Sequence, residues 1–342
     1  LGEILELQRG YDLPSSQMKK GDILVAGSNG VIGYHNEARS NHPCITVGRS
    51  GSVGKVHYYE QATWAHNTAL FVKDFKGNDP KYFYYFLKNL HLDKMFDKGS
   101  SVVPSLDRKV VHSLNVPCHK DIDCQKRIAA ILSKIDRKIE LNCAINQNLE
   151  AMAKQLYNYW FVQFDFPNEE GKPYKSSGGK MVWNEKLKRE IPFGWHCGNL
   201  FEIAVFTNGL ACQKFRPKDD EASLPVIKIR EMHDGISADT EKVTPNIPES
   251  VKVYNGDVLF SWSASLEVML WAYGLGGLNQ HIFKVTSAND FPKSFFYFQL
   301  LDYVDVFKKM AEARKTTMGH ITQDHLQQSA IAIPDNKDIA DR

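Results

Sequence analysis

Residues 128–159 read IAAILSKIDRKIELNCAINQNLEAMAKQLYNY, and this stretch decides the architecture of the chain. Apolar residues recur along it every seven positions in two rows offset by three, which is the pattern of a coiled-coil seam. One row holds Ile128, Ile135, Leu149 and Leu156, and the other holds Ile131, Ile145, Met152 and Tyr159. Leu132 and Ile139 widen the seam. The pattern predicts one long helix over residues 121–164.

A helix of this length would span about 65 Å at about 1.5 Å per residue. Its apolar stripe needs a partner helix, either from this chain or from another, because most helical stability comes from burying such a stripe. Asn142 falls on the seam, where a buried amide can fix the register and number of the helices. The residues expected to pack against a partner helix or a docked subunit are Ile128, Ile131, Ile135, Ile139, Asn142, Ile145, Leu149, Met152, Leu156 and Tyr159.

The segments on either side of this helix follow one sequence plan. Residues 1–118 and 200–334 share short matching stretches in the same order. The pairs are Leu1-Gly-Glu-Ile4 with Leu200-Phe-Glu-Ile203, Gly10 with Gly209, Lys20-Gly-Asp-Ile-Leu24 with Asn255-Gly-Asp-Val-Leu259, Asn67-Thr-Ala-Leu-Phe71 with Asn279-Gln-His-Ile-Phe283, and Tyr82-Phe-Tyr-Tyr-Phe86 with Ser294-Phe-Phe-Tyr-Phe298. A repeat this long indicates a duplicated domain rather than a solenoid unit.

Each copy has the pattern of an α+β domain. β-rich runs bounded by glycine, asparagine or proline are followed in each copy by a helix that begins near a proline, Pro80 or Pro292. The runs lie at 22–26, 44–47, 55–59 and 69–72 in the first copy, and at 226–229, 257–260, 268–271 and 282–285 in the second. The sequence therefore predicts an α+β fold of two similar domains with curved mixed β-sheets, separated by a long coiled-coil-type α-helix.

The composition is that of an ordinary globular protein, with 43% hydrophobic and 24% charged residues. No apolar run approaches the roughly 20 residues that a membrane span needs. The six scattered cysteines form no Cys-x-x-Cys pair, so we expect reduced thiols in a cytoplasmic protein. The net charge is only +2, although residues 1–120 carry fifteen Lys and Arg against eleven Asp and Glu. Local patches would therefore have to hold any nucleic acid.

Familiar catalytic motifs are absent from the sequence. Gly48-Arg-Ser-Gly-Ser-Val-Gly54-Lys55 resembles a phosphate-binding loop, but its outer glycines enclose five residues where the Walker motif needs four. We interpret it as a tight turn between strands, with amides and cations suited to a nucleic-acid phosphate. The Pro-Pro dipeptide of amino-methyltransferases is missing, and no nuclease or hydrolase motif stands out. We expect no catalytic residue, no metal site and no cofactor in this chain.

Two similar domains on a heptad helix, without a catalytic motif, resemble the specificity subunit of type I restriction–modification enzymes. The resemblance covers essentially the whole chain. Its most specific marks are residues 1–14 (LGEILELQRGYDLP), Trp64 to Phe71, residues 99–108 (GSSVVPSLDR), Gln125-Lys-Arg-Ile128 and Ile191-Pro-Phe-Gly-Trp195.

The resemblance implies that each domain is a target-recognition domain reading half of a split sequence in double-stranded DNA. The helices would dock two methyltransferase subunits, which bring S-adenosylmethionine, and restriction subunits can join them. If the first helix is left unpaired, a second copy of the chain, or another chain, would be needed to cover its apolar seam. The expected divisions are target-recognition domains at 1–118 and 195–335, a spacer helix at 119–165, a connector at 166–194, and the start of a truncated distal helix at 336–342.

Residues expected to contact DNA follow from side-chain chemistry, because Lys and Arg hold phosphates while polar side chains read base edges. In the first domain they are Lys19, Lys20, Arg49, Ser50, Lys55, Lys98, Ser100, Ser101, Arg108 and Lys109. In the second domain they are Lys214, Arg216, Lys218, Lys228, Arg230, Arg314, Lys315, Thr316 and Thr317. Because the domains differ in their loops, we expect two unlike half-sites with an indifferent spacer between them.

Two alternative functions remain open at this point. The chain could be a two-domain protein-binding adaptor that dimerises through its helix, or an enzyme with an unfamiliar site. Binding to random duplex DNA separates the adaptor from the specificity subunit. Methyl transfer by the chain alone would indicate the enzyme.

Overall fold

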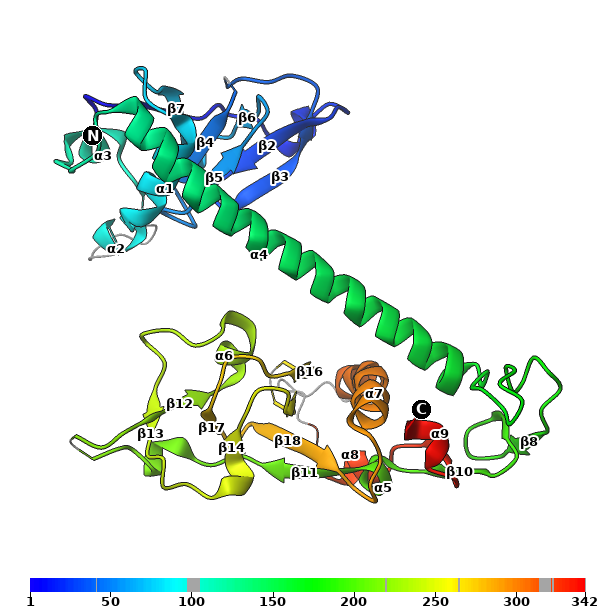
Figure 1. Cartoon of the computed structure of the whole chain (residues 1–342). Coiled ribbons are helices and arrows are strands. Elements are labelled where there is room, and N and C mark those ends of the chain that lie inside the picture. Colours follow the sequence, from blue (N-terminus) through cyan, green and yellow to red (C-terminus); the bar gives the residue numbers. More distant parts are fainter. Residues whose placement is uncertain are drawn as a thin grey trace. The chain divides into compact units, whose positions relative to one another are not determined.

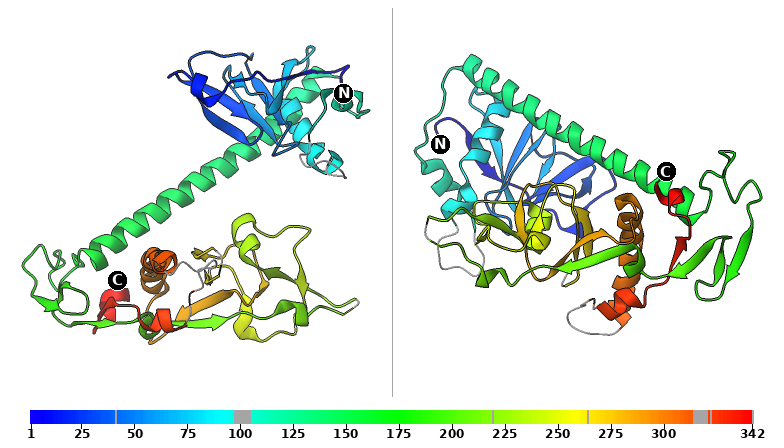
Figure 2. Two further views of the ribbon diagram at one scale, coloured as in Figure 1. Left: turned by 180° about the vertical axis from the view of Figure 1, so that it is seen from behind. Right: turned by 60° about the horizontal axis from the view of Figure 1, so that its bottom comes forward.

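The heptad stretch forms one long helix in the computed structural model of the chain, which describes residues 1–40, 42–96, 105–218, 220–263, 265–313, 321 and 323–341. Helix α4 spans Ile122–Tyr157 and continues as a π-helical turn over Asn158–Val162. Figures 1 and 2 show α4 as an unbroken helix from three directions. The chain divides into two compact units, Leu1–Asn146 and Gln147–Arg342, so α4 begins in the first unit and ends in the second.

The described residues of the first unit form two sheets. One is antiparallel with the order β1-β7-β4-β5, formed by β1 (Glu6–Arg9), β7 (Ala69–Asp74), β4 (Cys44–Gly48) and β5 (Val56–Tyr59). The other has the order β3-β2-β6, formed by β3 (Gly30–His35), β2 (Ile23–Gly27) and β6 (Trp64–Ala65). Because β2 is antiparallel to β3 and parallel to β6, this second sheet is mixed.

The main helix of the first unit begins where the sequence predicts. Helix α1 spans Pro80–Asn89, and the carboxylate of Asp79 caps it by accepting a hydrogen bond of 2.8 Å from the Tyr82 N–H. Its buried residues Phe83 and Leu87 join a core formed with the strands. The remaining short helices are a 3-10 turn (Ser15–Gln17), α2 (Leu92–Phe96) and α3 (Arg108–Ser113).

The second unit repeats this arrangement (Figure 1). Its antiparallel sheet has the order β11-β18-β15-β16, formed by β11 (Ala204–Asn208), β18 (Ile282–Ser287), β15 (Val258–Ser261) and β16 (Glu267–Leu270). Its mixed sheet has the order β13-β12-β17-β14, formed by β13 (Lys242–Val243), β12 (Leu224–Ile227), β17 (Gly276–Leu278) and β14 (Lys252–Val253). Two further antiparallel pairs are β10 (Trp195–Gly198) with β19 (Ile331–Pro334) and β8 (Met181–Asn184) with β9 (Arg189–Pro192).

Helix α7 (Lys293–Ala313) is the counterpart of α1 and packs on β16 and β18. Its buried residues Phe295, Leu300 and Phe307 join Phe260 of β15 in an aromatic core. The shorter helices of the second unit are α5 (Leu200–Ile203), α6 (Ile229–Asp234), α8 (Gln323–Gln327), α9 (Asp338–Asp341) and 3-10 turns at Cys212–Lys214 and Glu249–Val251.

Strand order shows which parts of the two units are equivalent. Strand β4 is equivalent to β15, because β4 pairs antiparallel with β7 as β15 does with β18. Strand β2 is equivalent to β12, because β2 pairs parallel with the short strand β6 as β12 does with β17. The sequence match of residues 20–24 with residues 255–259 is therefore wrong as a structural alignment, because the first segment enters β2 and the second enters β15. The shared Gly-Asp motif indicates a local turn or bend before a strand, and it does not indicate where that strand lies in the sheet.

Two other sequence matches are wrong by one residue. The backbone N–H of Gly10 donates to Ala69 over 3.0 Å, and the equivalent N–H of Gly209 donates to Ile282 over 3.1 Å. Ala69 is therefore equivalent to Ile282 and not to His281. The same shift aligns the buried helix residues Phe83 and Leu87 with Phe296 and Leu300.

Only the start of α4 packs into the first unit. Ala129 is buried and Ile128 packs partly against the same core. The following seam residues are 37–65% exposed, namely Ile131, Ile135, Ile139, Ile145, Leu149, Met152, Leu156 and Tyr159. Asn142 is exposed too. Within the described part of the chain the seam has no partner helix, and its packing against one stays a prediction.

The segment interpreted as a connector, residues 166–194, is folded. It contains the β8–β9 hairpin, and its residues Phe166 and Ile191 are buried in the core of the second unit. The carboxylate of Asp165 accepts hydrogen bonds from the N–H (2.7 Å) and the hydroxyl (2.6 Å) of Ser176, which anchor the segment. These bonds also lower the pKa of Asp165.

Candidate nucleic-acid interface

Four segments that are distant in sequence meet in the first unit. The N–H groups of Arg49 and Ser50 donate to the carbonyl of Thr68 over 2.9 and 3.2 Å, and the carbonyl of Arg49 accepts from the Leu106 N–H over 2.8 Å. The N–H of Ser28 donates to the Thr68 hydroxyl over 3.2 Å. We call residues 28–29, 49–50, 55, 66–68 and 105–106 the first loop cluster.

The glycine-rich loop of this cluster is a turn between antiparallel strands. It joins β4 to β5, as the tight-turn interpretation predicts, and no helix follows it as a nucleotide-binding loop would require. A Cβ atom on Gly48 would lie 1.9 Å from the Ser52 carbonyl oxygen, and Gly51 has a positive φ of 79°. Lys55, at the end of the loop, donates to the side-chain carbonyl of Asn29 over 2.8 Å.

The second unit builds the same arrangement from different residues. The N–H of Trp262 donates to the carbonyl of His281 over 3.3 Å, and the carbonyl of Trp262 accepts from the Ile321 N–H over 3.0 Å. The N–H of Asn279 donates to Ile227 over 3.0 Å, as His66 donates to Ala26 over 2.8 Å in the first unit. We call residues 227–228, 262, 279–281 and 321 the second loop cluster.

The hydrogen bonds give a residue-by-residue correspondence between the clusters. Arg49 corresponds to Trp262, Asn67 to Gln280, Thr68 to His281, and Leu106 to Ile321; the last pair is buried in both units.

Gly10 and Gly209 let the chain pass close to the backbone of one loop in each cluster, at His66 in the first unit and at Asn279 in the second. A Cβ on Gly10 would lie 2.1 Å from the His66 carbonyl oxygen, and one on Gly209 would lie 2.2 Å from that of Asn279. The backbone frame is thus repeated while the side chains that it presents differ.

The histidines of the matched loops have ordinary partners. The His66 ring lies 3.0 Å from the Thr68 hydroxyl, and burial lowers the pKa of His66. The ring of His281 lies 5.7 Å from that of Trp262. Both histidines therefore have side-chain neighbours within their own loop cluster.

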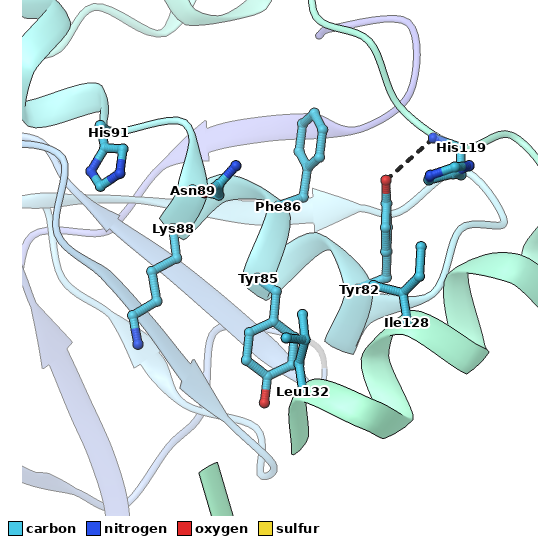
Figure 3. A pocket seen from close by; sticks show the side chains of 9 residues that line it. All are labelled: Tyr82, Tyr85, Phe86, Lys88, Asn89, His91, His119, Ile128 and Leu132. Atoms are coloured by element: carbon cyan, nitrogen blue, oxygen red, sulfur yellow. Dashed lines mark hydrogen bonds between the residues drawn. The ribbon is translucent and has the colours of Figure 1, made fainter. Parts of the chain in front are cut away.

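A cavity of about 490 Å³ lies between α1 and the start of α4 (Figure 3). Its lining is Tyr82, Tyr85, Phe86, Lys88, Asn89, His91, His119, Ile128 and Leu132. The Tyr82 hydroxyl accepts from the His119 N–H over 3.2 Å, and the Tyr85 hydroxyl donates to Asp136 over 2.8 Å. Burial, together with the Asp136 carboxylate, raises the pKa of Tyr85 to about 12. Its hydroxyl therefore stays protonated, and the cavity offers mainly apolar surface.

The described residues hold no group of three His, Cys, Asp or Glu side chains placed for a metal ion. The described residues include the three that come nearest to such a group in the sequence, Cys118, His119 and Cys124. In the same part of the chain, no helix has the length and apolar character that crossing a bilayer demands.

Comparison with known proteins gives matches to type I restriction–modification specificity proteins. Residues 1–151 match the family described as "Type I restriction modification DNA specificity domain". The MjaIX specificity subunit of Methanocaldococcus jannaschii is 24% identical over 266 residues, which cover 74% of this chain and 58% of that protein. The HindI specificity subunit of Haemophilus influenzae is 49% identical over 53 residues, 16% of this chain and 11% of that protein.

A solved structure has the same fold. The S subunit of a type I restriction–modification system from M. genitalium aligns with a TM-score of 0.59 at 15% identity, covering 99% of this chain and 84% of that one. Residues 1–151 belong to this DNA specificity domain family, and the chain over most of its length is similar to type I restriction–modification specificity subunits. It spans 58% and 11% of the lengths of the two relatives from M. jannaschii and H. influenzae.

Both the family and the fold class predicted from the sequence are thereby confirmed. The two named relatives are specificity subunits, which agrees with a non-catalytic recognition subunit. The M. genitalium structure agrees with an α+β specificity-subunit fold in which sheet-containing domains are separated by a long helix.

The residues predicted to contact DNA fall into four groups. Arg49, Ser50 and Lys55 come together at the first loop cluster. Other predicted cations are exposed elsewhere on their units, namely Lys19, Lys20, Arg108, Lys109, Lys214, Arg216 and Lys218. Outside the described residues lie Lys98, Ser100, Ser101, Arg314, Lys315, Thr316 and Thr317.

Two predicted cations of the second unit have carboxylate partners. Lys228, at the second loop cluster, pairs with Glu241 over 2.6 Å, and Arg230 pairs with the buried Glu231 over 2.7 Å. An ion-paired cation is a weaker phosphate ligand because its charge is already partly neutralised.

Residue chemistry alone missed the polar side chains that the fold adds to the clusters. These are Asn29, Asn67, Thr68, Trp262, Gln280 and His281. The repeated segments at 67–71 and 279–283 carried the signal, because they resemble each other while differing in their polar residues.

Proposed function

We propose that this chain is the DNA sequence-specificity subunit of a type I restriction–modification system and reads a bipartite target in double-stranded DNA. The observation that carries the proposal is the pair of loop clusters, whose backbone hydrogen bonds agree and whose side chains differ. Reading two unlike half-sites needs such a frame, because backbone geometry positions a reader while side chains select the bases.

In this proposal the exposed cations hold phosphates beside each cluster. The residues are those predicted from the sequence, with Arg49, Ser50 and Lys55 supported by their place in the first loop cluster. The proposed functional division is that of the sequence: target-recognition domains at 1–118 and 195–335, a spacer helix at 119–165, a connector at 166–194, and the start of a distal helix at 336–342.

We further propose that the α4 seam docks other subunits. Two methyltransferase subunits would bring S-adenosylmethionine, restriction subunits can join them, and a second copy of the chain is the alternative occupant. The exposed row of Ile, Leu and Met side chains supports this, because a soluble protein rarely leaves so long an apolar stripe uncovered.

A binding selection tests the function. The full chain, alone and co-expressed with its methyltransferase subunits, is incubated with a pool of random duplex DNA, and bound duplexes are sequenced. We expect two short unlike blocks at a fixed separation, and transfer of labelled methyl groups from S-adenosylmethionine only when the methyltransferase subunits are present. Failure to bind any duplex would favour the protein-binding adaptor, and methyl transfer by the chain alone would favour an enzyme.

A further inference from the structure

The two loop clusters place a side-chain amide at the same position. Asn67 and Gln280 each lie one residue before the carbonyl that receives the Arg49 or Trp262 N–H bond. Each also lies two residues before the first residue of the following strand, β7 or β18. The equivalence of Asn67 and Gln280 follows from the structure alone, because the sequence match pairs Asn67 with Asn279.

Both amides are partly exposed and incompletely used. The Asn67 amide N–H donates to Asp12, which also accepts from Arg9 over 3.3 Å. The Gln280 amide nitrogen lies 3.4 Å from the ring of His281. An amide has two N–H donors and a carbonyl acceptor, so among the described residues one N–H on each side chain and its carbonyl are left for a ligand.

This donor–acceptor pair matches one base edge. In the major groove, adenine presents the N7 acceptor beside the N6 amino donor, and Asn and Gln bind that edge with two hydrogen bonds. Thymine, cytosine and guanine do not present that pair on one base. The residue beside each amide differs between the two clusters: Arg49 presents a guanidinium in the first, and Trp262 presents an indole in the second. The bases beside the adenine should therefore differ between the half-sites.

We propose that Asn67 and Gln280 are specificity-determining residues, each reading an adenine edge in one half of the target. The inference rests on the proposed function and adds to it the residue, the base and the half-site. Asp12 is the positioning residue for Asn67, because its carboxylate accepts one amide N–H and so restricts the rotation of the side chain.

The experiment is the random-duplex selection repeated with variants of the full chain, alone and with its methyltransferase subunits. Asn67→Ala should remove the preference for adenine at one position of one half-site and leave the other half-site intact. Gln280→Ala should do the same in the other half. Affinity for the selected target should fall roughly 5- to 150-fold, the discrimination of one bidentate contact. The exposed amides Asn115→Ala and Gln328→Ala are matched controls and should change no preference.

Acidic variants sharpen the test because they keep side-chain size and exchange the donor for an acceptor. Asn67→Asp and Gln280→Glu should shift the preference at the same position from adenine towards cytosine, whose N4 amino group carboxylates accept. Loss of affinity for target and random duplex alike would mark the residues as structural and overturn the inference. Unchanged preferences in all four variants would also overturn it, while a wild-type chain that selects no sequence would overturn the proposed function itself.

Discussion

The side-chain carbonyl of Gln125, in the first turn of α4, accepts a hydrogen bond of 2.8 Å from the backbone N–H of Asp79, the residue that caps α1. The Gln125 amide donates to Asn78 over 2.8 Å and to the carbonyl of His119 over 2.7 Å. The side chain is fully buried, so one residue joins the starts of both helices.

Replacing Gln125 by alanine should destabilise the first unit. The change removes three partly buried hydrogen bonds, and each such bond contributes about 0.5–1.5 kcal/mol. We expect the free energy of unfolding to fall by roughly 2–4 kcal/mol in denaturant titrations followed by circular dichroism. Gln147→Ala, on an exposed position of the same helix, should stay within about 0.5 kcal/mol of wild type. Equal stability of the two variants would contradict the role of Gln125.

The second unit should lose stability as His196 loses its proton. Its two ring nitrogens lie 2.6 Å from Asp335 and 3.1 Å from Glu202, and only the protonated ring can donate to both carboxylates. Burial alone would lower the pKa of His196, but the two carboxylates outweigh it and the net shift is upward.

Because the folded pKa is raised, the stabilisation is complete below the unfolded value near 6.5 and is lost as pH rises through the folded value. The side chain is 46% exposed, so solvent screening limits the effect to about 1 kcal/mol or less. We expect His196→Gln to melt below wild type at pH 6 and together with it at pH 9. A gap between their melting temperatures that is the same at both pH values would refute this assignment.

Charge placed on the α4 seam should prevent subunit docking without unfolding the chain. Ile145 and Leu149 are 53% and 57% exposed, so aspartate at both positions should leave thermal stability nearly unchanged. Co-purification with methyltransferase subunits, or self-association measured by analytical ultracentrifugation, should be lost. Gln147→Asp, on the opposite face of the helix, is the control and should keep both. Normal assembly of the double variant would show that the seam is not the docking surface.

Removing Lys55 should weaken DNA binding uniformly across sequences. Lys55 belongs to the first loop cluster, where its ammonium bonds to Asn29. If it holds one phosphate, Lys55→Ala should reduce the slope of log K against log salt by about 1. Lys188→Ala, an exposed lysine paired with Glu185 beside the β8–β9 hairpin, should leave the slope unchanged. Identical slopes for Lys55→Ala and wild type would exclude a phosphate contact.

Local patterns in the sequence predicted the elements of this protein. The Asp79-Pro80 start of α1 and the heptad rows of α4 follow from capping chemistry and from a period near 3.5 residues, which neighbouring residues determine by themselves. The family was predictable as well, because its marks are short contiguous stretches such as Gln125-Lys-Arg-Ile128.

Tertiary structure alone decided the alignment of the two units and the composition of their loop clusters. Arg49 meets Thr68, and Trp262 meets His281, through backbone hydrogen bonds that depend on strand order. Strand order is a long-range property, so the shared Gly-Asp stretches could lead into β2 in one unit and β15 in the other. The sequence by itself determined that the chain has two related domains and a helix with an apolar seam. Which side chains stand together on each domain was decided by the pairing of strands far apart in the chain.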